Sequence, residues 1–263
     1  MRRPKIIEHV RPLNGWRAFV GEVGVIILGV LIALALGQFA TMLSWRADAA
    51  DARQAIAIEL GEALGQATER TGYAPCVYAR LDALAKLIDQ AAQDQRLPPL
   101  GDIGSPPIRP YHVGIWESIE SAQTTAHFNR DELNAYVSAY EHLRNLHDSN
   151  KQELAAWTRL YALVGPGRTL GDVEAIDLRR AVSDARVASR KMVLDSVRLQ
   201  QILKVYQLPY DQAAMREFAD RPVSKKEICQ PIDSAIPATY GQSPFRATLD
   251  RVRNSPVKRL GHS

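Results

Sequence analysis

Two carboxylates that could act as a general acid and a general base lie close together in the middle of the chain. Glu117 and Glu120 are three residues apart, so a helix would place both side chains on one face. The same spacing is typical of a solvated helix face without chemistry. An enzyme acting on envelope material would have Glu117, Glu120 or His127 as its acid–base groups. We keep this hypothesis as an alternative and assign no catalytic residue.

A metal site on one helix needs His, Asp or Glu ligands three or four residues apart. His127 and Asp131 have this spacing. Asn129 and Glu132, however, form a capping pattern that predicts the start of a new helix between those two ligands. The sequence therefore predicts no metal ion and no other cofactor.

Motifs for covalent catalysis and phosphate binding are weak. Ser255 and Lys258 match an SxxK pattern, but the SDN and KTG motifs that accompany it in β-lactamase-like enzymes are missing. The stretch GPGRTLGD at 165–172 lacks the spacing and the Lys-Ser/Thr pair of a phosphate-binding P-loop. It predicts a turn between helices.

The chain has two cysteines, Cys76 and Cys229. In an oxidising compartment these two thiols can form a disulfide, which would tie the C-terminal segment to the helices. Two buried free thiols are the alternative. No CxxC occurs, so a redox or zinc motif is unsupported.

The strongest pattern in the sequence is the apolar stretch from Gly21 to Trp45. Every residue from Val23 to Gly37 is apolar or glycine. About 20 helical residues cross roughly 30 Å of hydrocarbon, so the stretch predicts a transmembrane helix at 18–44. A cleaved export signal ending at Ala49 is the main alternative, but the apolar run exceeds the roughly 7–15 residues of such signals. A buried core helix is the third interpretation.

The charges on either side of the span predict its orientation. Five basic residues precede it, and only Arg46 and Arg53 follow it closely; the five are Arg2, Arg3, Lys5, Arg11 and Arg17. The positive-inside rule then predicts a basic cytoplasmic N-terminus at 1–17. The rest of the chain would lie on the periplasmic side of a bacterial inner membrane.

Two features of the span are candidates for function. Gly29, Ala33, Gly37 and Thr41 recur every four residues and predict a small-residue stripe on which another helix can pack closely. Glu22 is a carboxylate at the edge of the apolar region, suited to proton handling or to pairing with a partner's base. Common use of Gly and Ala in membrane helices, and pairing of Glu22 with Arg17, are the simpler explanations.

Composition supports one exported domain of ordinary size. The sequence has 46% hydrophobic and 24% charged residues, enough for a real core. Residues 44–263 hold 28 Lys/Arg and 27 Asp/Glu, so the basicity is concentrated before the span. This distribution predicts no nucleic-acid partner. The expected partners are the lipid bilayer and another membrane or periplasmic protein, or a second copy of the chain.

Helical periodicity predicts an all-α fold: a helical bundle at 45–208 and an irregular, proline-rich segment at 209–263. The membrane helix is expected to continue to a stop at Gly72, and a second helix to start at Pro75 and run to about 96. The apolar residues of its predicted inward face are Leu81, Leu84, Ile88 and Ala91. Residues 97–112 are expected to form a long connection or a surface arm for binding.

Three more helices are predicted after this arm, at about 114–126, from the Asn129 cap to Gly165, and at 172–207. The second should bury Leu133, Val137, Tyr140, Leu143, Leu154, Trp157, Tyr161 and Val164. The third should bury Val173, Ile176, Ala185, Met192, Leu199, Leu203 and Tyr206. No strands are predicted.

The span GEVGVIILGVLIALALGQF, followed by an Ala/Glu/Arg-rich helix, resembles a group of uncharacterised single-pass bacterial inner-membrane proteins. In that group a GE-(apolar)-GILIAL-type span leads into a helical exported domain. The segments WESIESAQ and ELNAYVSAYEHL are also similar. The resemblance covers about residues 16–165, and the sequence departs from it after Leu36. It implies topology and bacterial origin, and no site residue.

These observations favour a non-enzymatic membrane protein that acts as an interaction, scaffold or accessory subunit of an envelope complex. A periplasmic ligand-sensing bundle that signals through a partner is an alternative, as is the anchored enzyme. An interaction protein should expose apolar surface on the stripe or the 97–112 arm, and a sensor should have a pocket between helices.

Overall fold

The computed structural model describes residues 15–221 and 227–232, and all its long elements are α-helices. These are α1 (Gly15–Gln93), α2 (Gly114–Ser121), α3 (Arg130–Leu160), α4 (Asp172–Val205) and α5 (Gln212–Ala219). Single 3-10 turns occur at η1 (Thr124–His127), η2 (Tyr161–Leu163) and η4 (Glu227–Cys229). The all-α prediction is confirmed for this part of the chain. The basic residues before position 15 and most of 209–263 lie outside the described residues.

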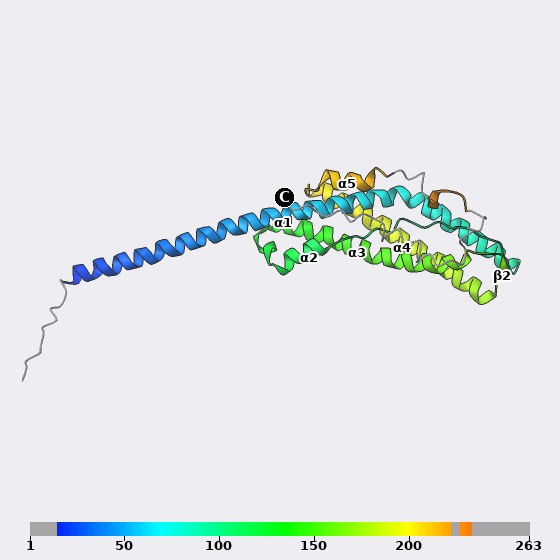
Figure 1. Ribbon diagram of the computed structural model, residues 1–263, viewed down its shortest axis with the longest axis horizontal. Helices are drawn as coiled ribbons and strands as arrows, with labels where there is room; N and C mark the ends of the chain where they lie inside the picture. Colours follow the sequence, from blue (N-terminus) through cyan, green and yellow to red (C-terminus); the bar gives the residue numbers. More distant parts are fainter. Residues whose placement is uncertain (1–14, 222–226, 233–263) are drawn as a thin grey trace, which may run out of the picture.

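Helix α1 has two different halves. Its N-terminal half projects alone from the rest of the molecule (Figure 1). The most apolar 18-residue window has a mean hydropathy of 2.6, and none of it is buried. This half is long and apolar enough to cross a membrane. From Ala49 onward α1 becomes amphipathic, and Ala52, Ile56 and Leu60 are buried.

We call residues 49–221 the helical body. Helices α1, α3 and α4 pack side by side along it, and α5 lies on α1 (Figure 1). Arg53 and Arg70 of α1 reach Glu132 and Glu153 of α3, so α3 runs in the direction of α1. Helix α4 returns toward the span. One apolar core lies at the end nearer the span, around Trp116, Tyr136 and Tyr140, and a second lies at the far end, around Leu84, Ile88 and Trp157.

The predicted break at Gly72 and Pro75 is wrong, because α1 continues through both residues to Gln93. Proline inside a helix removes one hydrogen bond and costs about 3 kcal/mol. On both sides of Pro75, however, large side chains are fully buried, including Tyr73, Val77 and Leu81. Each stabilises the packed helix by roughly 1.5–3 kcal/mol. Burial along one face therefore outweighs the local cost of the proline.

The expectation of no strands, and of a surface arm at 97–112, also needs correction. Strands β1 (Arg96–Leu97) and β2 (Arg168–Thr169) form a short antiparallel pair, and Leu100 bridges to Gly165 beyond it. This pairing draws the segment onto the body as a long connection between helices, the other expectation for it. Ile108 is exposed, but most of its large apolar side chains are buried: Leu97, Leu100, Ile103 and Tyr111. Two-residue strands leave no periodic signal in a sequence.

The inward faces of α3 and α4 are confirmed only in part. Tyr140, Leu143 and Trp157 are buried as predicted, as are Ala185, Met192, Leu199 and Leu203. Several predicted core residues are exposed instead: Val137, Leu154, Tyr161, Val173, Ile176 and Tyr206. The buried face of α3 includes small and polar residues such as Ala139, Ser149 and Glu153. A pattern drawn only through large apolar side chains therefore follows the wrong side of the helix in places.

Helix α2 is shorter than predicted, and the segment that follows it is a turn and a 3-10 helix. Helix α2 ends at Ser121 rather than near 126, since Gln123 adopts a left-handed conformation with φ of 59°. The predicted cap of α3 is confirmed: the Asn129 side chain accepts a hydrogen bond from the Glu132 backbone N–H at 2.8 Å.

The C-terminal segment, expected to be irregular, contains helix α5. Asp211 caps it by accepting a hydrogen bond from the Ala214 N–H, and its own N–H donates to the Ala57 carbonyl of α1. Gly61 and Gly65 make this contact possible, because a Cβ at either position would overlap with backbone atoms of Asp211 or Met215. Two glycines on one face of α1 thus allow α5 to pack directly against the backbone of α1.

Candidate interaction groove at the base of the helical body

A groove with a volume of about 800 Å³ lies where α1 leaves the span and meets η1. One part of its lining belongs to the span: Ala33, Leu34, Gly37, Gln38, Thr41 and Met42. The other part belongs to the base of the body: Trp45, Arg46, Ala49, Arg53 and His127. The groove therefore passes from apolar and small side chains to a cationic and aromatic end.

Three of the four predicted stripe residues line this groove, while Gly29 lies further along the same helix. A Cβ added at Gly29 or Gly37 would meet nothing within 4 Å, so the backbone there is open. The Thr41 hydroxyl donates to the Gly37 carbonyl at 3.0 Å. Its polar group is satisfied within α1, and the stripe presents a smooth surface on which a second helix could approach closely.

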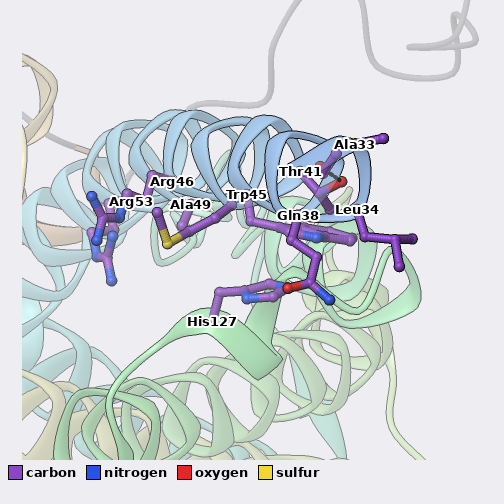
Figure 2. A pocket seen from close by; sticks show the side chains of 11 residues that line it. Ala33, Leu34, Gln38, Thr41, Trp45, Arg46, Ala49, Arg53 and His127 are labelled. Atoms are coloured by element: carbon purple, nitrogen blue, oxygen red, sulfur yellow. Dashed lines mark hydrogen bonds between the residues drawn. The ribbon is translucent and has the colours of Figure 1, made fainter. Parts of the chain in front are cut away.

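Trp45 and His127 close the end of the groove. Their rings stack with centroids 4.3 Å apart and an angle of 24° between planes. Figure 2 shows the two rings facing each other from α1 and η1, with Gln38 pointing toward the side where His127 lies. A tryptophan just beyond an apolar span is typical of the membrane–water interface. The stack thus fixes η1 against α1 at the level where the span ends.

A second contact holds the start of α3 against α1. Arg53 forms two hydrogen bonds with the Glu132 carboxylate, at 2.6 and 3.0 Å, and its guanidinium lies 4.8 Å from the Phe128 ring centre. The hydrogen bond to Glu132 raises the pKa of Arg53. Paired, planar contacts of this kind position groups accurately. They keep His127, one residue before Phe128, in place over Trp45.

The candidate acid–base groups are not brought together. Glu117 and Glu120 are exposed on α2, and Glu120 lies 3.5 Å from Arg144. His127 is stacked on Trp45, while Asp131 lies in the first turn of α3. Within the described residues, no group of three His, Cys, Asp or Glu side chains has a geometry for a metal ion.

Glu22 is exposed on the projecting half of α1. The side chain of Arg17, the base expected to pair with it, lies outside the described residues. Glu22 is therefore placed on the span, one turn beyond Phe19, and apart from the groove.

A second, more polar cavity of about 470 Å³ adjoins the first through Arg53. It lies between α1, the start of α3 and the turn after α4. Its lining includes Asp131, Glu132, Tyr136 and Tyr206. Burial raises the pKa of Tyr136 to about 12.

A buried ionic centre, which the sequence analysis did not predict, lies in the middle of the body. Arg70 is 2% exposed; its Nη2 donates to Glu153 of α3 at 2.6 Å and to Ser189 of α4 at 2.7 Å. Beside it, Glu69 accepts two hydrogen bonds from Arg109 at 2.6 and 2.8 Å. Burial raises the pKa of Glu153, although the neighbouring Arg70 opposes this. These partners are 40 or more residues apart in the chain, so no local pattern could reveal them.

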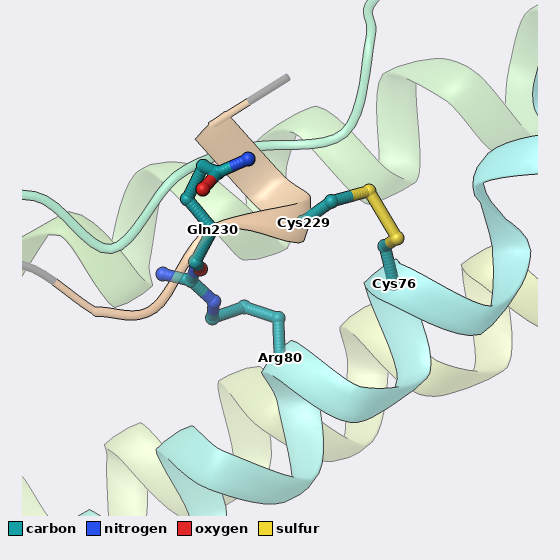
Figure 3. The surroundings of a disulfide bond; sticks show 4 residues. All are labelled: Cys76, Arg80, Cys229 and Gln230. Atoms are coloured by element: carbon teal, nitrogen blue, oxygen red, sulfur yellow. A yellow bond between two sulfur atoms is a disulfide. The ribbon is translucent and has the colours of Figure 1, made fainter. Parts of the chain in front are cut away.

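Cys76 and Cys229 form a disulfide with a Cα–Cα distance of 4.9 Å. It joins α1 to η4 across 153 residues of sequence. Arg80, one turn further along α1, donates to the carbonyl of Gln230 (Figure 3). It also donates to the carbonyl of Ile103. The bridge and Arg80 together fasten the chain near residue 230 and the buried arm to the far half of the body.

No protein-family model matches this sequence, and neither a curated protein nor a solved structure is significantly similar to it.

Proposed function

We propose that the chain is a single-pass protein of a bacterial inner membrane, with its N-terminus in the cytoplasm and its helical body in the periplasm. There it acts as an interaction, scaffold or accessory subunit of an envelope complex. The observation that carries this proposal is the groove, in which the small-residue stripe of the span continues into the base of the body.

The disulfide supports the orientation. Bridges such as Cys76–Cys229 persist in oxidising compartments, including the periplasm, and are rare in the cytoplasm. The charge bias around the span favours the same orientation. Two independent features of the sequence and the fold therefore agree on the side of the membrane.

The continuity of α1 favours an uncleaved anchor over an export signal. The small-residue pattern at Ala47 and Ala49 lies inside the helix, and Ala49 is 3% exposed in the core of the body. Cleavage after Ala49 would remove a residue that packs in the core of the body. An uncleaved α1 would join the anchor directly to the body, which suits a subunit that holds a periplasmic surface at a set distance from the membrane.

Partner binding by the stripe can be tested by co-purification. The full chain is tagged, extracted from its host membrane in mild detergent, and compared with the single variants Ala33→Leu and Ala35→Leu. Both alanines are exposed on the span, but only Ala33 lies in the groove. We expect a stoichiometric partner protein that is lost from Ala33→Leu and kept by Ala35→Leu. Recovery of the chain without any stoichiometric protein would contradict the proposal.

The second cavity favours a ligand sensor as a second candidate. Its charged and aromatic lining, at Arg53, Glu132, Tyr136 and Tyr206, suits a small polar molecule. A thermal-shift screen of periplasmic metabolites on the purified chain tests this candidate. A hit should disappear in a Tyr206→Ala variant, because Tyr206 lines the cavity. The variant should still fold, since Tyr206 is exposed and its removal leaves the core intact.

A further inference from the structure

The outer face of α4 carries an apolar stripe that no element of the described chain covers. Val187, Leu194, Val197 and Val205 are exposed, and Arg190 and Gln201 lie between them at spacings of three and four residues. Val187 is 67% exposed and Val205 is 73% exposed. The stripe is about 27 Å long. This spacing is the pattern of a helix surface that packs against another helix.

The exposed charges that α4 itself places beside this stripe are all positive. Four exposed bases lie along it: Arg190, Lys191, Arg198 and Lys204. None of them forms an ion pair with the described residues. Asp195, the single acid of α4 beyond Asp184, is 4% exposed and faces His142 at 3.0 Å. The surface from Val187 to Tyr206 is therefore apolar and basic.

The other half of α4 differs in this respect. Apart from Asp172, its charged residues are paired with neighbours within the chain, at Arg159–Asp184, Arg168–Glu174, Arg179–Asp89, Arg180–Asp177 and Arg186–Asp82. The same helix thus satisfies its charges in one half and leaves bases unpaired beside apolar side chains in the other. The contrast indicates that the second half is completed by something outside the described chain.

A membrane surface does not fit this stripe. Thr68 of α1 contacts Gln200, and Asp82 of α1 pairs with Arg186, so these contacts locate the stripe along α1. At about 1.5 Å per residue, this part of α1 lies roughly 35 to 55 Å beyond Trp45. The body continues along the axis of the span (Figure 1). The part of the stripe from Val187 to Val197 therefore lies far beyond the end of the span, while its other end is nearer, where Tyr206 and Arg53 line one cavity. Lipid headgroups cannot reach the part from Val187 to Val197.

A second copy of the chain fits poorly too. Two copies anchored in one membrane would place their α4 helices in the same direction, and Arg190 and Lys191 would face the same bases of the partner copy. Like charges in such an arrangement are destabilising. A partner with negative charges therefore fits this surface better than a second copy of the chain.

We propose that the second half of α4, from Val187 to Tyr206, docks an acidic amphipathic helix of another periplasmic protein or domain. Its apolar face would cover Val187, Leu194 and Val197, and carboxylates on both sides would pair with the four bases. This inference rests on the proposed function and names the chemistry of the partner.

The test is photo-cross-linking in the native host, with a photoreactive residue in place of Val197 on the stripe or Gln152 on the exposed side of α3. We expect the Val197 position alone to form a protein adduct. Mass spectrometry should map this adduct to a segment in which acidic residues flank apolar ones at helical spacing. Adding Arg190→Glu and Arg198→Glu should reduce its yield about tenfold or more.

An adduct with lipid, with a second copy of the chain or with a segment that is not acidic would overturn the inference, as would no adduct at all. Failure here remains distinct from failure of the proposed function. A partner that co-purifies through Ala33 while Val197 forms no adduct would refute only the docking surface on α4.

Discussion

Arg70 shows at the scale of single residues how polar groups determine the interior of the body. Its guanidinium and the Glu153 carboxylate are each 2% exposed, and Nε and Nη1 of Arg70 make no hydrogen bond within the described residues. Removing water from two charges costs several kcal/mol, and their attraction only partly offsets that cost. Such a pair specifies one arrangement of helices more than it adds stability.

We expect Arg70→Met to lower the free energy of unfolding by about 3–5 kcal/mol, because it leaves the Glu153 charge buried without its partner. The double variant Arg70→Met with Glu153→Leu should recover most of this loss. Chemical denaturation of the detergent-solubilised chain measures both values. A double variant as unstable as the sum of the two single variants would show that the charges do not act as a pair.

Buried tyrosines give a pH dependence with a defined sign. Burial raises the pKa of Tyr136 to about 12 and also raises those of Tyr111 and Tyr140, whose neighbours include Glu153 and Glu59. The folded state thus favours the neutral phenol. This contribution is complete below pH 10, the ordinary pKa, and is lost as the pH rises toward 12. We expect stability to fall in this range, and part of the tyrosinate absorbance to appear only with loss of helical circular dichroism. Full ionisation with the helices intact would contradict this.

At the scale of elements, the sequence predicted what depends on local pattern. The apolar span, the Asn129 cap and the main apolar positions of α1 follow from residue type and spacing alone. The continuity of α1 through Pro75 did not, because it depends on tertiary burial of Tyr73 and Val77. The predicted inward faces of α3 and α4 were wrong where alanine, serine or a paired glutamate occupies the core.

The groove could be predicted in part. The stripe from Gly29 to Thr41 was visible as a repeat of small residues. His127 could not be placed beside it, because the contact depends on the left-handed Gln123 turn and on the pairing of Arg53 with Glu132. Gly61 and Gly65 have the same four-residue spacing as the small-residue stripe of the span. This spacing is a signal that would have indicated where α5 packs on α1.

Glycine substitutions test the close contact between α1 and α5. Alanine normally stabilises a helix interior by roughly 0.5–1 kcal/mol relative to glycine. At Gly61 we expect the opposite, since the new Cβ would overlap with the Asp211 carbonyl and displace α5. Gly114→Ala is the control, because a Cβ there meets nothing within 4 Å. Thermal unfolding of both variants decides the matter, and an unchanged or raised midpoint for Gly61→Ala would contradict the close contact.

The disulfide links distant elements and should contribute strongly to stability. Closing a loop of 153 residues is worth up to about 5 kcal/mol on the chain-entropy estimate. We expect Cys229→Ser to lower the free energy of unfolding by about 2–5 kcal/mol, and reduction of the unchanged chain to have a similar effect. Denaturation curves with and without reductant measure this. A denaturation curve that is the same with and without reductant would show that the disulfide does not stabilise the folded chain.

The whole molecule is an apolar helix that runs without a break into a rigid, disulfide-linked body. The body continues the axis of the projecting half of α1 (Figure 1). The groove lies at the base of the body, and the proposed docking surface on α4 lies further along it. A continuous α1 fixes the distance and the rotation between them.

The most direct test of this account is site-specific photo-cross-linking within the span in host membranes. A photoreactive residue at Leu34, which lines the groove beside the small-residue stripe, is compared with one at Leu36, which lies off the groove on the same helix. We predict a single discrete protein adduct at Leu34 and none at Leu36, because each replacement substitutes an exposed side chain that is already large. Lipid adducts alone at both positions, or equal protein adducts at both, would contradict the claim that the stripe binds a partner helix.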